Sequence, residues 1–594
     1  MRRLWRCAGL SIALVAALLP LASAKAAALV RHSGYLTMAD GVRLRYTVVR
    51  PAGTARYPTL LEYSGYDPGT NPDAAYISQF VGRGYAYMGL NLRGTGCSEG
   101  TFDFFQPQEA ADGARAIDWI TRQPWSDAKV GMIGKSYPGI TQLFVAEQQP
   151  KGLVAIAPGH FFGDAYRDIA RPGGVANLGF SSLWSFVGRP SYEFESSPAQ
   201  VASGDTTCAN GSTAALRGNN PFVQLLQHPY DDALYAQRSP ITHLDRIRVP
   251  MLATLAWQDE ELGSRNTELL GTLDDLNRSR VARGEAPTPW WATLTNGDHG
   301  MARTPTELAD LQRFFDHFLK GIDNGWGQRP RVQVWWEAGR NGTRAPAWVT
   351  GLSHWSDSQR TVHPWALDLR AGSSLSASAP RPGEAPDSYV DGPGTQGIGN
   401  PHYGYAALPS VYTWNASPPQ GVAWTSAPMA NDMTLLGSGS VNLWITSTAP
   451  DTDLEVMLTE IRPDGQEVYV QKGWLKASLR TQDPTRSTTL RPYQTDVNPT
   501  PLVPGQPTLV RVELLPFGTL IRKGSRLRLW VEAPTVLPEL WSFPPPPYPA
   551  VNAVLHDPAH VSQVVLPLVP NDPNRIESYP ACNTVIRQPC RPAS

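Results

Sequence analysis

The chain has 594 residues, a formal net charge of −1 and only 17% charged side chains. This length is too great for a single hydrophobic core and predicts two or three domains. Sparse, balanced charge excludes the basic footprint of a nucleic-acid-binding protein, so no nucleic-acid partner is expected.

The first 24 residues have the pattern of a secretory signal peptide. Basic residues up to Arg6 precede an apolar run at 10–21, and Ala22-Ser23-Ala24 forms a small-x-small cleavage site. The run is shorter than the roughly twenty residues that a membrane span requires. We therefore expect cleavage near Ala24, export to the periplasm or medium, and no membrane span in the mature chain. An uncleaved anchor is the alternative, and the choice between Sec and twin-arginine export stays open.

Strand-like and helix-like segments alternate from residue 41 to residue 319. The expected strands are 43–49, 59–63, 85–92, 130–133, 153–157, 251–256 and 290–294. The expected helices are 74–81, 108–121, 140–149, 267–281 and 306–319. This alternation predicts the α/β class, with a mostly parallel sheet covered on both faces.

The alternation breaks in the middle of this region, which divides the expected α/β core into residues 30–160 and 249–321. The intervening residues 161–248 are rich in aromatics, glycine and polar turns. An insertion at this point would lie over the carboxyl edge of the sheet, so it predicts a cap.

Short β-rich runs separated by Pro, Gly and Asp occupy residues 331–594. They are 331–337, 362–367, 440–446, 454–461, 508–515 and 526–531. This spacing predicts an antiparallel β-sandwich. Residues 373–399 are poor in apolar side chains and predict a long loop.

Four cysteines lie beyond the expected signal peptide, and export would favour disulfides between them. Four cysteines allow three pairings. Cys582 and Cys590 are close in sequence, which favours a bridge between them and leaves Cys97 to pair with Cys208. Free buried thiols are the alternative for the second pair.

Residues 130–140 carry the pattern of a nucleophile elbow. An apolar run ends in Gly134-Lys135-Ser136-Tyr137-Pro138-Gly139, and a segment with helical spacing follows at once. A strand, tight turn and helix in this order would hold Ser136 at a strained tip and expose its Oγ. A side chain at Gly134 or Gly139 would collide with the neighbouring strand or helix. A chance serine–glycine turn is the alternative.

Two other patterns compete with this interpretation. The strict G-x-S-x-G pattern lies at 96–100 around Ser98, but a loop separates it from its strand and no helix follows. Gly134-Lys135-Ser136 resembles the end of a phosphate-binding loop, yet Lys129 stands where that loop needs glycine. Ser136 in the elbow context remains the predicted nucleophile.

A serine nucleophile needs a base and an acid that orients the base. In α/β-hydrolases these follow the serine in the order acid, histidine, each after a late strand. Asp259 follows the strand at 251–256, and His299 follows the strand at 290–294. We predict that Asp259 fixes the tautomer of His299, which takes the Ser136 proton and returns it to the leaving group. A solvated acidic turn and a loop histidine are the alternative.

Several motifs carry a family resemblance. They are Arg93-Gly94, Ser98-Glu99-Gly100, Asp118-Trp119-Ile120, Trp125-Ser126, Val130-Gly131-Met132 and the G-x-S-Y-x-G at Ser136, continued by 155–158, Asp164, Tyr166-Arg167 and 314–321. With them the chain resembles the cocaine-esterase branch of the X-Pro dipeptidyl-peptidase family over most of residues 30–550, specifically as far as Gly321. The resemblance implies an α/β-hydrolase core, a helical cap, a C-terminal all-β jelly roll like galactose-binding domains, and serine hydrolysis of ester or amide bonds.

The resemblance also implies an oxyanion hole. Its two donors would be the hydroxyl of Tyr66 and the backbone N–H of Tyr137, the residue after the nucleophile. Two donors aimed at one developing oxyanion are each worth roughly 100-fold or more in rate. Packing against the cap is the alternative role for Tyr66.

Residues around the triad leave the substrate open. Glu260, Glu261 and Asp164 would suit a substrate ammonium, although solvated surface charge is an alternative for each. Trp184 in the expected cap would suit an aromatic acyl group, as would Phe180 and Phe186, with cap packing as their alternative. Gln258 before the acid and the two glutamates after it depart from the family pattern.

The prediction is an exported serine hydrolase that acts on small esters, amides or short peptides, with no cofactor and no metal. An X-Pro dipeptidyl-peptidase or α-amino-acid ester hydrolase is the alternative enzyme. A glycan-binding protein with an idle hydrolase core is the alternative of another class, although the intact triad opposes it. The oligomeric state is not predicted.

Overall fold

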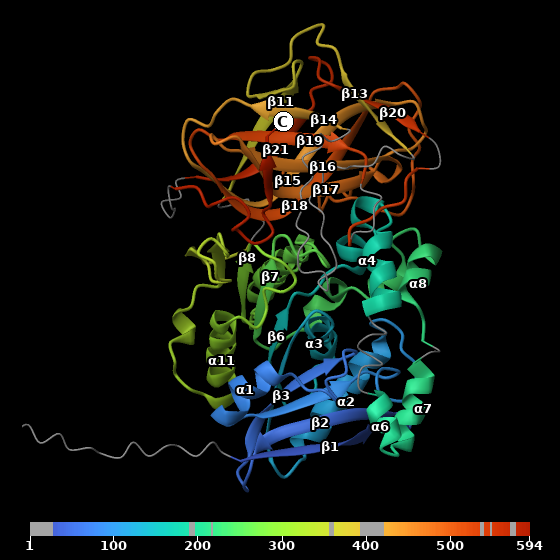
Figure 1. Ribbon diagram of the computed structural model, residues 1–594, viewed down its shortest axis with the longest axis vertical. Coiled ribbons are helices and arrows are strands. Elements are labelled where there is room, and N and C mark those ends of the chain that lie inside the picture. The colour runs from blue at the N-terminus through green and yellow to red at the C-terminus, as the bar shows by residue number, and fades with distance from the viewer. Residues whose placement is uncertain are drawn as a thin grey trace, which may run out of the picture.

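The computed structural model describes residues 28–188, 197–215, 218–355, 362–392, 421–534, 540–546, 549–570 and 578–593. It contains an α/β domain and an all-β domain that pack against each other, with short cap helices along one flank (Figure 1). The expected signal peptide at residues 1–24 lies outside the described residues.

The α/β domain is built on a ten-stranded sheet with the order β1-β2-β4-β3-β5-β6-β7-β8-β9-β10. The pairs from β4 to β9 are parallel, and the pairs at both edges are antiparallel. The strands are β1 Leu29–Thr37, β2 Arg43–Pro51, β3 Tyr57–Ser64, β4 Ala86–Asn91, β5 Ser126–Lys135, β6 Leu153–Gly159, β7 Met251–Ala256, β8 Trp290–Thr295, β9 Val332–Trp336 and β10 Trp348–Leu352. All seven strands expected in this region are present.

Helices cover both faces of this sheet, as the alternating pattern predicts. They are α1 Ala74–Phe80, α2 Pro107–Thr121, α3 Tyr137–Glu147, α10 Glu268–Ala282 and α11 Pro305–Lys320. Phe80 of α1 and Phe314 of α11 belong to one buried cluster, whereas α2, α3 and α10 contribute to another. Helices therefore bury both faces of the sheet.

The cap occupies the predicted insertion. Its helices are α4 Leu178–Leu183, α6 Ser197–Ala202, α7 Thr206–Ala215, α8 Pro221–Gln227 and α9 Ala233–Gln237. A disulfide between Cys97 and Cys208 joins α7 to the loop after β4. This bridge fastens the cap to the α/β core.

Within its described residues, the all-β domain has twelve strands around a separate buried cluster. They are β11 His363–Arg370, β12 Ser374–Ser376, β13 Asp387–Asp391, β14 Val422–Ser426, β15 Met433–Ser447, β16 Asp453–Ile461, β17 Gln466–Lys476, β18 Thr508–Ile521, β19 Arg526–Glu532, β20 Ala550–Leu555, β21 Gln563–Val569 and β22 Cys590–Pro592. Their described pairings are antiparallel except for the short β12–β14 pair. The jelly-roll topology stays a prediction.

Two expectations need correction. The α/β sheet continues past the predicted boundary at residue 331, because β9 pairs with β8 and β10 with β9. An apolar run such as Val332–Trp336 reads alike in either kind of sheet, so its pattern did not reveal which sheet it joins. The expected loop at 373–399 contains β12 and β13 within its described part, and residues 393–399 lie outside the described residues.

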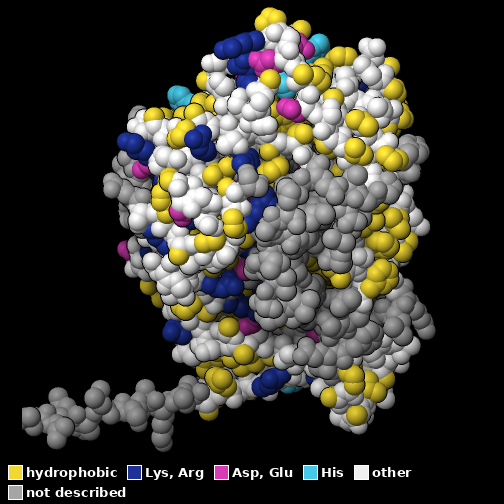
Figure 2. Space-filling model, turned by 45° about the horizontal axis from the view of Figure 1, so that its top comes forward, with side chains coloured by type: hydrophobic (Ala, Val, Ile, Leu, Met, Phe, Trp, Pro, Cys, Tyr) yellow, Lys and Arg dark blue, Asp and Glu magenta, His cyan; other side chains and the backbone are white. Residues whose placement is uncertain are grey.

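Hydrophobic, basic and acidic side chains are interspersed over the described surface of the face shown in Figure 2. Among the described residues, no helix combines the length and apolar character needed to cross a membrane.

Candidate active site

Ser136 lies at the turn between β5 and α3, at the carboxyl edge of the sheet. Its backbone has φ 63° and ψ −131°, a strained conformation for a residue with a side chain. A Cβ on Gly139 would lie 2.3 Å from the Gly159 carbonyl oxygen, and one on Gly134 would lie 2.6 Å from Pro138 Cβ. Both glycines are therefore required for the turn, as the sequence pattern predicts.

Ser98 has a structural role instead. It is fully buried, and its Oγ accepts a hydrogen bond from the Arg45 backbone N–H at 2.9 Å. Its own N–H donates to the Thr95 carbonyl at 2.9 Å. The strict G-x-S-x-G pattern thus closes a loop against β2.

Tyr66 and Tyr137 lie beside the elbow. The Tyr66 hydroxyl is 3.3 Å from Ser136 Oγ. Trp184 of the cap donates its indole N–H to the same hydroxyl at 3.2 Å, which orients it. Tyr137 is the first residue of α3, so its backbone N–H belongs to the helix end beside the serine. The cap therefore helps to position Tyr66.

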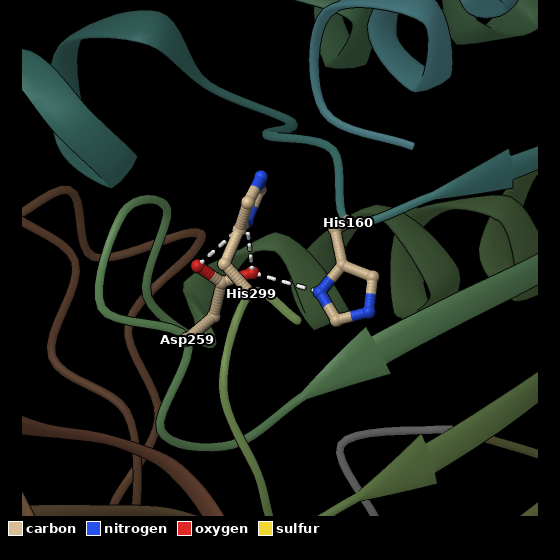
Figure 3. A group of neighbouring side chains, drawn as sticks. All are labelled: His160, Asp259 and His299. Atoms are coloured by element: carbon tan, nitrogen blue, oxygen red, sulfur yellow. Dashed lines mark hydrogen bonds and ion pairs between the residues drawn. The ribbon is translucent and has the colours of Figure 1, made fainter. Parts of the chain in front are cut away.

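Asp259 and His299 come together at the ends of β7 and β8 (Figure 3). His299 Nδ1 lies 3.0 and 2.9 Å from the two Asp259 oxygens. Asp259 Oδ1 also accepts the backbone N–H groups of Glu261 and Leu262, both at 3.0 Å. The carboxylate is thus held by its own loop while it binds the imidazole.

A second buried histidine, His160, shares the same carboxylate (Figure 3). Its Nδ1 lies 2.9 Å from Asp259 Oδ2, and its backbone carbonyl accepts the Ser136 N–H at 3.1 Å. Burial lowers the pKa of His160, so the neutral ring donates its Nδ1–H to Asp259. His160 therefore connects the elbow to the acid. Sequence analysis missed it, although it directly follows β6 at the catalytic edge.

The charges of this group depend on one another. Burial opposes ionisation of Asp259, but the His299 imidazole and the hydrogen bond from His160 hold the pKa of that carboxyl well below its ordinary value. Burial also opposes protonation of His299, but Asp259 and Glu261 together raise its pKa to about 9. The resting pair is therefore an imidazolium and a carboxylate at neutral pH.

The second nitrogen of His299 faces the site. Within the described part of the chain, His299 Nε2 makes no hydrogen bond. It lies 3.4 Å from Glu261 Oε2, and the Glu261 side chain is 18% exposed. Lys135 Nζ donates to the His299 carbonyl at 3.0 Å and fixes the backbone of the same loop. Sequence analysis gave Lys135 no such role.

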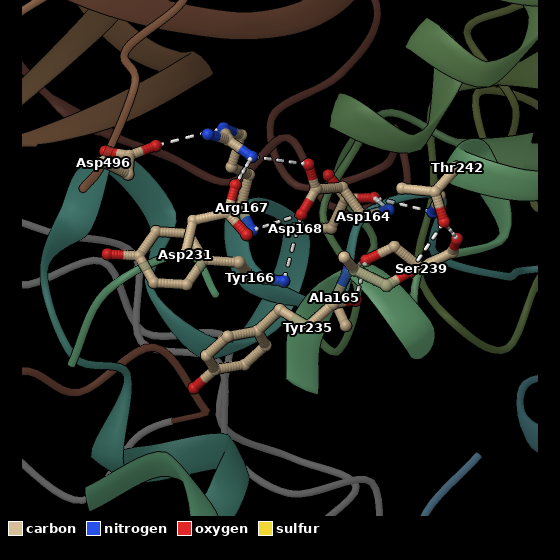
Figure 4. A network of polar contacts seen from close by, with 12 residues as sticks. Asp164, Ala165, Tyr166, Arg167, Asp168, Asp231, Tyr235, Ser239, Thr242 and Asp496 are labelled. Atoms are coloured by element: carbon tan, nitrogen blue, oxygen red, sulfur yellow. Dashed lines mark hydrogen bonds and ion pairs between the residues drawn. The ribbon is translucent and has the colours of Figure 1, made fainter. Parts of the chain in front are cut away.

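The other two candidate ammonium ligands are occupied. Glu260 is buried, binds Arg587 at 2.6 Å and accepts the His299 N–H at 2.9 Å. Asp164 caps the turn that begins at Ala165 and binds Arg167 at 2.9 Å (Figure 4). Neither carboxylate is free for a substrate, because each already neutralises an arginine. Sequence patterns did not reveal these partners.

A pocket of about 520 Å³ opens at these side chains. Its lining includes Ser136, Tyr66, His299, Glu261, Glu260, Lys135, Phe180, Trp184 and Leu540. Trp184 and Phe180 therefore line the pocket, whereas Phe186 is 58% exposed and packs against Phe222 of the cap. Leu540 comes from the all-β domain, so both domains shape the pocket.

Two family patterns match the chain. Residues 40–300 match the X-Pro dipeptidyl-peptidase (S15 family) pattern, and residues 324–565 match the X-Pro dipeptidyl-peptidase C-terminal non-catalytic domain. Residues 578–593 lie outside both matches.

Relatives and solved structures agree with these matches. The cocaine esterase of Rhodococcus is 25% identical over 601 residues, covering 90% of this chain and 97% of the relative. A Mycobacterium bovis protein named for serine esterase activity is 27% identical over 575 residues, covering 84% and 89%. A Staphylococcus aureus CocE/NonD family hydrolase is similar in fold, with a TM-score of 0.72, 20% identity and coverage of 91% and 94%.

The fold and these relatives define an α/β serine hydrolase with an appended all-β domain. Within that class, the chain belongs to the X-Pro dipeptidyl-peptidase (S15) family, whose members similar to this chain include the cocaine esterase. The predicted family and hydrolase class are confirmed.

Proposed function

We propose that this protein hydrolyses ester or amide bonds through Ser136, His299 and Asp259 and an acyl-enzyme intermediate. The observation that carries the proposal is the orientation of His299. Its Nδ1 is bound to Asp259, while its Nε2 is without a hydrogen bond in the described chain, at a pocket that Ser136 also lines.

The reaction follows from this arrangement. Deprotonated His299 accepts the proton of Ser136 Oγ as the serine attacks the substrate carbonyl. The Tyr66 hydroxyl and the Tyr137 N–H then donate to the oxyanion. His299 returns the proton to the leaving group, and water, activated by the same imidazole, releases the acyl group. For attack, His299 Nε2 must exchange its contact with Glu261 for one with Ser136.

Fluorophosphonate labelling tests the nucleophile without knowledge of the natural substrate. We expect Ser136→Ala to abolish labelling and the hydrolysis of p-nitrophenyl esters, a loss of roughly a thousandfold or more. The control is Ser98→Ala, which should leave both largely intact if the protein stays folded. Loss of labelling in the folded Ser98→Ala variant alone would assign the nucleophile to the other motif.

A second candidate, hydrolysis of substrates with a free α-amino group, depends on Glu261. It is the one carboxylate among the three candidates that lines the pocket without an arginine partner in the described chain. Because His299 already faces Glu261, we expect free and N-acetylated amino-acid esters to differ by less than about tenfold in kcat/KM. A much stronger preference for free Xaa-Pro amides over aryl esters would favour the peptidase alternative.

We also propose that the protein is exported and cleaved near Ala24. The composition of residues 1–24 and two disulfides, Cys97–Cys208 and Cys582–Cys590, support this. Fractionation of the native host, with N-terminal sequencing of the purified protein, tests it. An intact Met1 on protein recovered from the cytosol would contradict the proposal.

A further inference from the structure

The segment 578–593 reaches from the all-β domain to the loop that carries His299. Its β22 pairs with β17, and Arg591 binds the buried Glu467 at 3.0 Å. Next to these anchors, the disulfide Cys582–Cys590 closes a loop that contains Arg587. The segment is therefore fixed at its base on β17.

The tip of this loop is bound to the α/β domain through Ile586, the residue before Arg587. Ile586 donates its N–H to the Ala338 carbonyl at 3.0 Å and accepts from Asn296 Nδ2 at 3.1 Å. Asn296 lies three residues before His299. A Cβ on Gly339, whose φ is 99°, would lie 2.4 Å from the Thr584 carbonyl oxygen. This close approach shows that the loop is seated tightly.

Arg587 is the residue that this loop delivers. Its guanidinium binds Glu260 Oε1 at 2.6 Å, and both side chains are almost fully buried, at 6% and 2% exposure. The other oxygen, Glu260 Oε2, accepts the His299 backbone N–H at 2.9 Å. The Glu260 carboxylate thus links an arginine near the C-terminus to the backbone of the proposed base.

Without this cation, Glu260 would be left among three other carboxylates, with Arg344 as a remaining positive charge in the described chain. Asp259 and Glu261 flank it in sequence, and Asp298 lies on the facing loop, where Arg344 binds it at 2.8 Å and Arg587 Nε lies 3.5 Å from its Oδ2. A buried carboxylate left without its partner either takes up a proton or moves toward solvent. Movement would release the His299 N–H and displace the imidazole.

We propose that Arg587 is a positioning residue for His299, acting through Glu260 and delivered by the disulfide-closed loop. This inference rests on the proposed function of His299 as the base. It assigns a catalytic purpose to the segment outside the family matches.

The test compares Arg587→Met with Arg587→Lys, and with Arg591→Met as a control on the same loop. Readouts are the fluorophosphonate labelling rate, kcat and KM on an aryl ester, and the melting temperature. In Arg587→Met we expect labelling and kcat to fall about tenfold or more while KM changes less than about threefold. Arg587→Lys should recover much of the loss because it retains the charge. Arg591→Met should lower the melting temperature and keep the labelling rate.

Equal loss in both Met variants, or unchanged labelling in folded Arg587→Met, would overturn the proposal. The double variant Glu260→Gln/Arg587→Met removes the charge pair but keeps an amide oxygen for the His299 N–H. It should recover most of the labelling rate, and it carries the test if Arg587→Met alone does not fold. A double variant that folds but labels as slowly as inactive protein would also overturn it. Labelling of the Ser136→Ala variant, in contrast, would contradict the proposed function itself. The Arg587 variants test only the positioning of His299, so the two failures can be told apart.

Discussion

The two halves of the proposed active site, the elbow with Ser136 and the loops with Asp259 and His299, are supported in different ways. The elbow half is held by nearby parts of the α/β domain: Ala157 donates its N–H to Gln142 at 2.8 Å, and Ser136 donates to the Gly159 carbonyl at 2.9 Å. The half that carries Asp259 is held by both domains, since Gln471 of the all-β domain also donates to the Trp257 carbonyl at 3.0 Å. The proposed nucleophile is thus placed within the α/β domain, whereas the proposed acid and base also depend on contacts from the all-β domain.

The all-β domain contributes several contacts to the half of the site that carries Asp259. Gln258, next to the acid, donates to the Val470 carbonyl of β17 at 3.2 Å, and Leu540 lines the pocket. Together with Arg587 on Glu260, these contacts make the second domain part of the support for the acid and base. Changes in the all-β domain should therefore weaken proton transfer more than they disturb the serine.

Among the substitutions considered below, Tyr66→Phe should cause the largest loss of kcat. It acts on the elbow half of the site. The substitution removes one hydroxyl and little volume, so kcat should fall by roughly 2–4 kcal/mol of barrier, about 30- to 1000-fold, with an unchanged melting temperature. Steady-state kinetics and calorimetry measure both.

Tyr63→Phe is its matched control. Tyr63 is fully buried, and its hydroxyl has no hydrogen-bond partner in the described chain. Its kcat should match the wild type. A Tyr66→Phe variant with unchanged kcat would remove Tyr66 from the oxyanion hole.

His160 tests the connection between the two halves. His160→Leu leaves Asp259 Oδ2 without one donor, so the acid can rotate, and kcat should fall about 10- to 100-fold. His160→Asn offers an amide N–H near the position of Nδ1 and should recover part of the loss. Kinetics of both variants, with circular dichroism to show that each is folded, decide the matter. Equal activity in Leu and Asn variants would mean that His160 only fills space.

The same difference explains what could be predicted from sequence. Elements of the core, the elbow at Ser136 and the order Ser136, Asp259, His299 are local patterns, and each carries its own turn and strand signals. The roles of His160 and Arg587 depend on contacts at sequence separations of 99 and 327 residues. No periodicity reports such contacts, and for the same reason Glu260 looked available for a substrate. Asp164 differs, because its partner Arg167 lies only three residues away.

Glu261 allows a test of what sets the pKa of His299 in the other half of the site. Asp259 and Glu261 both raise the pKa of His299, to about 9, by stabilising the imidazolium. Only the neutral ring can accept the Ser136 proton, so kcat/KM of the free enzyme should rise with pH until about 9.

Glu261→Gln removes one of the charges that stabilise the imidazolium and keeps the side chain's shape. The pKa of His299 should then fall, which moves the acid limb of the kcat/KM profile to lower pH by roughly one unit. At pH values above both limbs the two enzymes should converge, because His299 is neutral in each. Glu285→Gln, which removes an exposed charge paired with Arg283, is the control and should not move the limb. An unmoved limb in Glu261→Gln would mean that Asp259 alone sets the protonation of the base, and that Glu261 is available to the substrate.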